Sequence, residues 1–358
     1  MNLLSSQKKP VFRFLWRALY LIGFISAAAP LVAAGKPKVH VIGTGGTISG
    51  AAPDRMQLAG YKAGTFLIKD MLAQIPELSE IADVSSEQLV NVGSGNIGNK
   101  ELLQIAKRIN TLCKEQPDIV GFVVTHGTGT LDETSYFLDL TCRTDKPVII
   151  VGSMRPWTAL SSDGPLNLYN AVRVAAFPES RGKGAMIVMN DEINGAREGT
   201  KTDTERVETF NSREFGLLGY ADPDKVVFYR TPLFRHTDNS EFDVSKLDAL
   251  PRVDIVYGYQ DATGVAVDAL VAAGAAGIIT VTTSPEMTPS LKAARAKGVA
   301  IVGTDRKGQG RMLHSANASK NGFVSGDNLR PQKARMLLQL ALTITKDPVE
   351  IQRIFDTY

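Results

Sequence analysis

The sequence contains few of the residues that most often bind metals or form disulfides. Among its 358 residues are two cysteines and four histidines, and the histidines are scattered without the spacing of a metal site. We therefore predict no metal or other cofactor, and we do not expect catalysis by a cysteine. The sequence also has no low-complexity run and no repeat of solenoid period, so a repeat protein is excluded. The histidines are His40, His126, His236 and His314.

The fingerprints of nucleotide binding are missing as well. Gly43 and Gly45 follow an apolar segment, but Ile48 stands where the dinucleotide fingerprint requires its third glycine. No acidic residue ends a following strand about twenty residues later, and no lysine stands at the Walker position. Nucleotide binding is therefore not expected.

The first 34 residues differ in composition from the rest of the chain. They contain four basic residues and no acid, followed by an apolar stretch over 18–34 that ends in Val32, Ala33 and Ala34. This arrangement is typical of a secretory signal peptide cleaved after Ala34. An uncleaved membrane anchor is the alternative, but the apolar run is short for a spanning helix and Pro30 precedes the small residues. We predict a periplasmic or secreted protein without stable membrane association after processing.

Removal of this leader changes the charge of the chain. The whole sequence carries a net charge of +3, whereas the remaining 324 residues carry about −1, because the leader holds four basic residues and no acid. The basic character belongs largely to the leader, so no nucleic-acid partner is predicted. Export places the chain in an oxidising compartment, where the sequence favours a structural disulfide between Cys113 and Cys142 over two free thiols.

Short β-branched runs alternate with helix-like stretches from residue 38 to about residue 230. Helices are expected where apolar residues recur at spacings of three and four, and strands where short apolar runs precede turns. Such alternation predicts a mostly parallel sheet covered by helices. The expected strands are 37–42, 84–91, 119–124, 148–151 and 185–189, and the expected helices are 101–110, 132–140 and 165–176.

A polar stretch without strong periodicity, residues 231–252, separates this region from a second alternating one. We predict an α/β protein of two domains, each a mostly parallel sheet covered by helices. Residues 35–230 form the N-terminal domain with the active site, residues 231–252 the linker and residues 253–358 the smaller domain. In the smaller domain the expected strands are 253–257, 277–282 and 299–303, and the expected helices are 265–273, 289–296, 331–345 and 348–356.

Two glycine-framed threonine segments, 44–49 (TGGTIS) and 125–130 (THGTGT), each follow an expected buried strand. The carboxyl ends of parallel strands are where open α/β sheets build their ligand sites. Glycine permits tight turns there and lets a ligand approach the backbone. Either segment alone is equally compatible with a plain turn, but the two together predict one shared pocket.

Together these segments resemble the two signatures of the bacterial-type asparaginase/glutaminase family, TGGTI and HGTDT. The resemblance covers nearly the whole chain after the leader and is closest to the exported type II branch. It implies an amidohydrolase that cleaves the side-chain amide of L-asparagine, with L-glutamine left open as a further substrate. It also implies a homotetramer in which a neighbour's smaller domain completes each site. Further similar stretches are 145–153, 154–156 (MRP), 162–171 (SDGPLNLYNA), 188–191, 199–202 (GTKT), 242–247 and 329–347.

Amide hydrolysis through a covalent acyl intermediate requires an activated nucleophile and a group that takes its proton. By the resemblance, Thr47 is the primary nucleophile and Tyr61 the tyrosine that contacts it, while Thr128 is a second threonine paired with Lys201. On the residues alone, an exposed loop aromatic and a solvated charge are the better interpretations of Tyr61 and Lys201. Backbone N–H groups able to stabilise an oxyanion are expected at Gly45, Gly46, Gly127 and Gly129.

The chain departs from the family pattern where the substrate's α-amino group is expected to bind. Gly129 stands where the second signature has aspartate, and Gly95 stands where a glutamine is usual. Ser94, which the resemblance assigns to the substrate's α-carboxylate together with Thr128, is present. Asp203 and Glu286 are the candidates to supply the missing carboxylate.

These departures leave three hypotheses open. The leading one is an exported asparaginase or asparaginase/glutaminase in which another carboxylate replaces the one missing at Gly129. The second is an amidohydrolase of the same fold that acts on an amide without a free α-amino group. The third is a non-catalytic ligand-binding protein on this scaffold.

Overall fold

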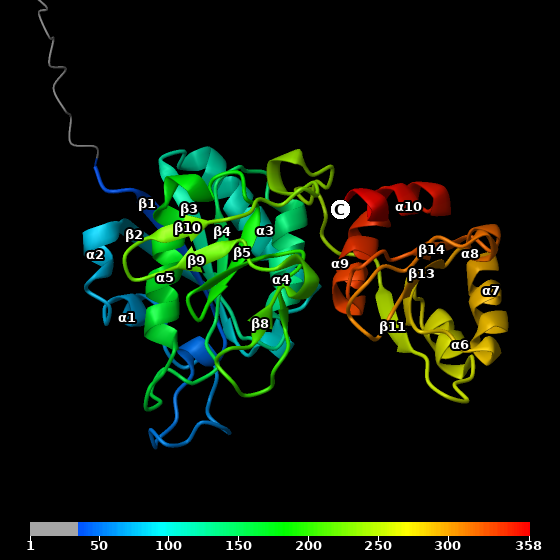
Figure 1. The fold of residues 1–358 in the computed structure, drawn as a ribbon, viewed down its shortest axis with the longest axis horizontal. Helices are drawn as coiled ribbons and strands as arrows, with labels where there is room; N and C mark the ends of the chain where they lie inside the picture. Colours follow the sequence, from blue (N-terminus) through cyan, green and yellow to red (C-terminus); the bar gives the residue numbers. More distant parts are fainter. Residues whose placement is uncertain (1–34) are drawn as a thin grey trace, which may run out of the picture. The chain divides into compact units, whose positions relative to one another are not determined.

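The computed structural model describes residues 35–358, so the predicted signal peptide lies outside the described residues. Two large sheets organise this part of the chain, one of eight strands and one of four (Figure 1). None of its helices has the length and apolarity needed to cross a membrane.

The eight-stranded sheet has the order β10-β9-β6-β5-β4-β3-β1-β2. Its parallel strands are β1 (Lys38–Gly45), β2 (Asp83–Val92), β3 (Ile119–Thr125), β4 (Val148–Val151) and β5 (Ala185–Met189). An antiparallel extension adds β6 (Glu192–Gly195), β9 (Gly219–Ala221) and β10 (Val226–Phe228). A separate ribbon pairs β7 (Thr200–Lys201) with β8 (Phe210–Asn211).

The strand order of this sheet determines where a ligand can bind. The chain leaves β1 for the edge strand β2 and then returns to form β3 on the other side of β1. Connections therefore run in opposite directions from β1 and β3, which opens a crevice at the carboxyl ends of these two strands. The two threonine segments begin at this edge, because β1 ends at Gly45 and β3 ends at Thr125.

Apolar side chains cover both faces of the parallel strands. Val41 and Ile42 are both fully buried, yet they belong to different apolar clusters because successive side chains in a strand point to opposite faces. One cluster is formed with α3 (Asn99–Glu115) and α4 (Leu131–Thr141). The other is formed with α5 (Gly164–Ala176), α1 (Ile68–Leu72) and α2 (Leu78–Ile81). The sheet is therefore a rigid platform for the turns at its edge.

The four-stranded sheet is parallel throughout, in the order β11-β12-β13-β14. Apolar residues of α9 join the cluster that also contains α4 and one face of this sheet, so this core is continuous with that of the larger sheet. The strands are β11 (Val253–Tyr257), β12 (Gly277–Val281), β13 (Ala300–Thr304) and β14 (Phe323–Ser325). The helices are α6 (Val265–Ala272), α7 (Thr288–Ala296), α8 (Ala316–Lys320), α9 (Pro331–Ala341) and α10 (Pro348–Thr357).

The predicted fold class, two mostly parallel sheets covered by helices, is confirmed. The short strands β6, β9, β10 and β14 were not predicted, because strands this short leave no recognisable pattern unless they contain four apolar β-branched residues in a row, as β4 does. The helix expected over 331–345 ends at Ala341 instead. Between residues 231 and 252 the only regular element is the 3₁₀ turn η5 (Thr237–Asn239), although Phe242 and Val244 of this stretch are buried in the core.

The expected disulfide is wrong: Cys113 and Cys142 are both free thiols. Cys142 lies in the apolar core beside α4, and Cys113 packs against the same core. Burial raises the pKa of both thiols above the ordinary value, which keeps them protonated and unreactive.

Candidate active site

The two threonine segments touch each other through their glycines. Gly46 has a φ of 89°, in the left-handed region that favours glycine. A Cβ atom at Gly46 would lie 2.3 Å from the backbone nitrogen of Gly127. Only a residue without a side chain allows this contact, so Gly46 holds the segment after β1 against the segment after β3. The shared pocket that the sequence predicts is therefore consistent with the backbone geometry.

Thr47 follows this contact directly, as the first residue of the 3₁₀ turn η1 (Thr47–Ser49), and its side chain is largely buried. Its Oγ1 lies 2.6 Å from the hydroxyl of Tyr61. Tyr61 sits at the base of a loop that Ala51 and Lys62 close with two backbone hydrogen bonds of 3.0 Å. Tyr61 is half-buried, so the interpretation as a solvent-exposed loop aromatic does not describe it.

Thr128 has its own partner. The Nζ of Lys201 donates a hydrogen bond of 2.9 Å to Oγ1 of the buried Thr128. Lys201 is the second residue of β7, where antiparallel pairing with Phe210 orients it. Burial lowers the pKa of Lys201 below its ordinary value, and the nearby carboxylates Glu205, Asp203 and Asp132 oppose that shift. Lys201 is therefore not a freely solvated charge.

A second lysine fixes the backbone that leads to Lys201. Lys333, on α9, is almost completely buried. Its Nζ donates to three carbonyl oxygens just before β7: Ala196 at 2.6 Å, Arg197 at 3.0 Å and Gly199 at 2.5 Å. A buried ammonium is stable only when its donors are satisfied, and these three carbonyls satisfy all of them.

The backbone donors expected to stabilise an oxyanion are not equally available. The N–H of Gly46 donates to the carbonyl of Val92 at 2.9 Å, so the expectation for Gly46 is wrong. Within residues 35–358, the N–H groups of Gly127 and Gly129 donate to no other group. These two amides beside Thr128 are therefore free to donate to a bound group.

His126 lies inside the second threonine segment but is completely buried. Its Nδ1 lies 2.7 Å from the carbonyl oxygen of Gly127, and its Nε2 lies 2.9 Å from Oγ1 of Thr134. Burial lowers the pKa of His126 to about 4, which keeps the ring neutral near pH 7. His126 therefore orients the Gly127 peptide and is not placed to exchange protons with a ligand.

An open cavity of about 450 Å³ lies beside the Thr128–Lys201 pair. Gly129 borders this cavity, and a Cβ atom at Gly129 would lie 2.9 Å from Oγ of Ser94. Gly95 has open space around it. Neither glycine has the positive φ that excludes other residues, so the missing side chains leave accessible space. The cavity is lined by Gly129, Asp132, Glu133, Lys201, Thr202, Asp203, Thr204 and Gln332.

The structure distinguishes between the two carboxylates that were proposed to replace the one missing at Gly129. Asp203 lines the cavity, but its Oδ1 already accepts hydrogen bonds from the backbone N–H groups of Glu205 and Arg206, at 2.8 and 2.9 Å. Glu286 lies exposed on η6 (Pro285–Met287) of the smaller sheet's region and is not among the residues that line the cavity.

Sequence reasoning missed the acidic start of α4. Asp132 is buried, and its Oδ2 accepts hydrogen bonds from Oγ1 of Thr200 at 2.7 Å and from Nε2 of Gln332 at 3.1 Å. This carboxylate links α4 to the residue before Lys201 and to α9. Glu133, next along the helix, lines the cavity. Both follow Gly129 within four positions in the sequence, and this closeness is the signal from which they could have been found.

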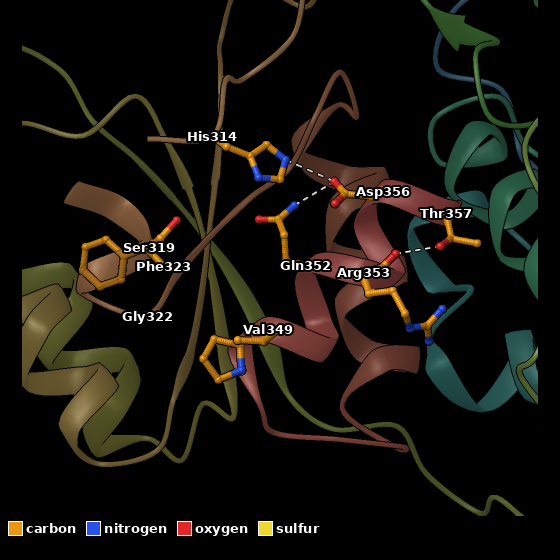
Figure 2. A pocket seen from close by; sticks show the side chains of 10 residues that line it. His314, Ser319, Gly322, Phe323, Val349, Gln352, Arg353, Asp356 and Thr357 are labelled. Atoms are coloured by element: carbon orange, nitrogen blue, oxygen red, sulfur yellow. Dashed lines mark hydrogen bonds and ion pairs between the residues drawn. The ribbon is translucent and has the colours of Figure 1, made fainter. Parts of the chain in front are cut away.

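Another cavity, also of about 450 Å³, lies between α10 and the segment around α8 and β14. Figure 2 shows the side chains of His314 and Gln352 directed at Asp356, with hydrogen bonds of 3.2 and 3.0 Å. Arg353 is engaged by Glu241 instead. Since neither threonine pair lines this cavity, the threonine segments remain the candidate active site.

Comparison with known proteins identifies related sequences and structures. The family described as "Asparaginase, N-terminal" matches residues 38–234, and "Glutaminase/Asparaginase C-terminal domain" matches residues 252–355. "L-asparaginase 2" of Bacillus subtilis is 47% identical over 90% of this chain and 87% of its own length. "Probable L-asparaginase periplasmic" of Haemophilus influenzae is 44% identical over 91% of this chain and 94% of its own length.

A solved structure named "Probable Cytoplasmic L-asparaginase", from Campylobacter jejuni, is 43% identical and superposes with a TM-score of 0.88. It covers 90% of this chain and all of that one. The matches span both sheets and both threonine segments. The chain belongs to the asparaginase family.

Proposed function

We propose that this protein hydrolyses the side-chain amide of L-asparagine to L-aspartate and ammonia, with Thr47 as the nucleophile. The observation that carries the proposal is the pair of engaged hydroxyls at one sheet edge, Thr47 with Tyr61 at 2.6 Å and Thr128 with Lys201 at 2.9 Å. The close relatives named asparaginases support the choice of amide. A threonine hydroxyl is a weak nucleophile unless a neighbour takes its proton, and each threonine has such a neighbour.

The first half of the reaction forms an ester on Thr47. Oγ1 of Thr47 bonds to the amide carbon and its proton passes to the Tyr61 oxygen, while the Tyr61 hydroxyl gives its own proton to the amide nitrogen, so that the phenol stays neutral. The C–N bond then breaks, and the nitrogen leaves as ammonia with the proton received from Tyr61. The negative charge that develops on the amide oxygen requires donors that are already in place. The free N–H groups of Gly127 and Gly129 are the donors that the segment after β3 offers.

The second half of the reaction releases the acid. A water molecule attacks the ester carbon and one of its protons passes to the Thr128–Lys201 pair. The bond to Oγ1 of Thr47 then breaks, the acid is released, and the proton held by the pair returns to Oγ1 to restore the hydroxyl. Neutral lysine can accept a proton, and burial of Lys201 favours that neutral form. Ser94 lies next to Gly129, since a Cβ atom at Gly129 would lie 2.9 Å from Oγ of Ser94. It is therefore placed to hold the α-carboxylate of the substrate.

A second candidate function has a specific observation in its favour. Gly129 and Gly95 offer no side chain to an α-amino group, so an amide that lacks this group is a competing substrate. The purified chain from residue 35 onward distinguishes the candidates by the ammonia that it releases. We expect release from L-asparagine at a higher kcat/KM than from succinamate, which is asparagine without its α-amino group. A preference for succinamate would favour the second candidate, and no release from any amide would favour a binding protein.

Gly129→Asp is expected to lower the KM for L-asparagine. The backbone accepts a side chain here, and the only atom within 3.0 Å of the new Cβ is the rotatable Oγ of Ser94. A new carboxylate beside the substrate's ammonium is expected to lower the KM by about tenfold, which corresponds to ~1.4 kcal/mol. Steady-state ammonia release measures the change.

The matched control for this variant is Gly129→Asn, which has the same size and the same contact with Ser94 but no charge. We expect its KM for asparagine to stay at the value of the unchanged protein or to rise. An equal decrease in both variants would mean that the new side chain acts by packing and that its charge is irrelevant.

The predicted export and assembly also belong to the proposal. The composition of residues 1–34 supports a cleaved leader, and the relative from Haemophilus influenzae is named periplasmic, whereas the solved neighbour is named cytoplasmic. We propose a periplasmic or secreted homotetramer on the strength of the leader and of the family resemblance. The site residues proposed are Thr47, Tyr61, Thr128 and Lys201 for catalysis, and Ser94, Thr128 and Gly129 for substrate binding.

A further inference from the structure

An amino-acid substrate brings a positive α-ammonium group into the site, and this group must find a negative partner when water is displaced. Gly129 cannot supply one. Three carboxylates line the cavity that Gly129 borders: Asp132, Glu133 and Asp203. Which of them is free to accept an ammonium follows from the hydrogen bonds that each already makes.

Two of the three are engaged by the protein. Asp203 accepts two backbone N–H groups of its own turn and lies 3.6 Å from Nη1 of Arg206. Asp132 is buried, with Oδ2 bound to Thr200 and Gln332 and with Oδ1 bound to the backbone N–H of the next residue at 3.1 Å. Carboxylates satisfied in this way gain little from a further donor.

Glu133 differs from both. No group within residues 35–358 donates a hydrogen bond to its carboxylate. Its nearest cation is Arg335 on α9, whose Nη1 lies 3.8 Å away, beyond hydrogen-bond distance. The side chain is only 23% exposed. This carboxylate has lost most of its water and has gained an ion pair with Arg335 but no hydrogen bond in the protein, so it can still accept a donor at the wall of the cavity.

The position of Glu133 suits this role. It lies in the first turn of α4, and it lines the same cavity as Gly129, which precedes the helix. Because Gly129 has no side chain, this residue leaves the space toward Oγ of Ser94 unfilled.

We propose that the Glu133 carboxylate binds the α-ammonium group of the amino-acid substrate, in place of a carboxylate at position 129. This inference rests on the proposed function, because it names the group that selects an α-amino acid for the same site. Glu133 takes the place of the two carboxylates suggested by the sequence. Asp203 is engaged in its own turn, and Glu286 is not among the residues that line the cavity.

The charges around Glu133 predict a pH dependence. Burial and the neighbouring Asp132 raise the pKa of Glu133 to about 7, and Arg335 opposes this shift. Lys201 and Asp203 are the other charged groups at the cavity. Only the ionised form binds an ammonium, so the KM for L-asparagine should rise as the pH falls through about 7, and the KM for succinamate should not.

Glu133→Gln tests the proposal, since it keeps the size of the side chain and removes its charge. We expect the KM for L-asparagine to rise by about 30-fold or more at pH 8, with kcat less affected. The KM for succinamate should change by less than about threefold. Glu133→Asp should recover part of the preference for asparagine. Glu80→Gln removes an exposed carboxylate on α2, outside the cavity, and should leave both substrates unchanged.

Other outcomes would overturn the proposal in distinguishable ways. If Glu133→Gln keeps the preference for asparagine over succinamate, another group binds the ammonium. If both substrates weaken equally, Glu133 supports the fold through Arg335. If the unchanged protein releases ammonia from neither amide, the proposed function itself fails. Arg335→Gln adds an independent test, because loss of the guanidinium raises the pKa of Glu133 and should move the rise in KM to higher pH.

Discussion

Thr47→Ala is expected to reduce ammonia release from L-asparagine by about 10⁴-fold or more. The variant removes the oxygen atom that is proposed to bond to the substrate carbon. The Tyr61 hydroxyl, which lies 2.6 Å from that oxygen, is not expected to replace it as the nucleophile. The free amides of Gly127 and Gly129 and the Thr128–Lys201 pair remain. Because these groups stabilise a reaction that no longer has its nucleophile, binding of the substrate should persist while turnover is lost.

The expected result depends on a folded variant, so the thermal midpoint should be measured beside the rate. Thr47→Ser keeps the hydroxyl and should retain measurable turnover. Thr65→Ala removes an exposed threonine hydroxyl that donates to the carbonyl of Lys62, and should leave the rate unchanged. Equal turnover in Thr47→Ala and the unchanged protein would show that Thr47 is not the nucleophile. In that case Thr128→Ala, tested under the same conditions, would identify the second threonine as its replacement.

The strands that could be predicted from the sequence are those covered on both faces of the sheet. Residues 148–151 form a strand in both the prediction and the structure, because four apolar β-branched residues in a row fit only a covered parallel strand. The antiparallel strands β9 and β10 were missed, since three residues at a sheet edge pair through their backbone and need no apolar pattern. The predicted pairing of Cys113 with Cys142 was wrong, because an oxidising compartment does not determine whether two cysteine side chains have the geometry of a disulfide.

The candidate site also contains some residues that could be predicted from the sequence and others that could not. Thr47 and Thr128 were predictable because each follows a recognisable strand, and the strand order β2-β1-β3 then brings their turns together. The hydrogen-bond state of a side chain is not visible in a sequence. Asp203 was proposed because it lies two residues after Lys201, whereas the structure shows its Oδ1 bonded within its own turn. Glu133 carries no motif, and it is distinguished only because it lines the cavity without a hydrogen-bond donor in the protein.

Lys201→Gln is expected to lower kcat for L-asparagine by about 10²- to 10⁴-fold. Glutamine can still donate a hydrogen bond to Oγ1 of Thr128, as Nζ of Lys201 does at 2.9 Å, but it cannot accept a proton. The proposed step that needs this proton acceptor is the attack of water on the ester at Thr47. In this variant the ester should therefore form and then persist. An acid-quenched reaction with asparagine should yield a peptide containing Thr47 whose mass is increased by the acyl group.

The pH dependence separates a proton acceptor from a lysine that only positions Thr128. A base acts in its deprotonated form, so kcat should rise with pH toward the pKa of Lys201, which burial holds below the ordinary lysine value. The exposed Glu205 raises this pKa, so Glu205→Gln should lower it and move the rise in kcat to lower pH. Lys201→Arg keeps the positive charge but cannot lose its proton, and should remain as slow as Lys201→Gln. If Lys201→Arg restores turnover, or if Glu205→Gln leaves the profile in place, Lys201 acts through its charge and hydrogen bond and another group must activate the water.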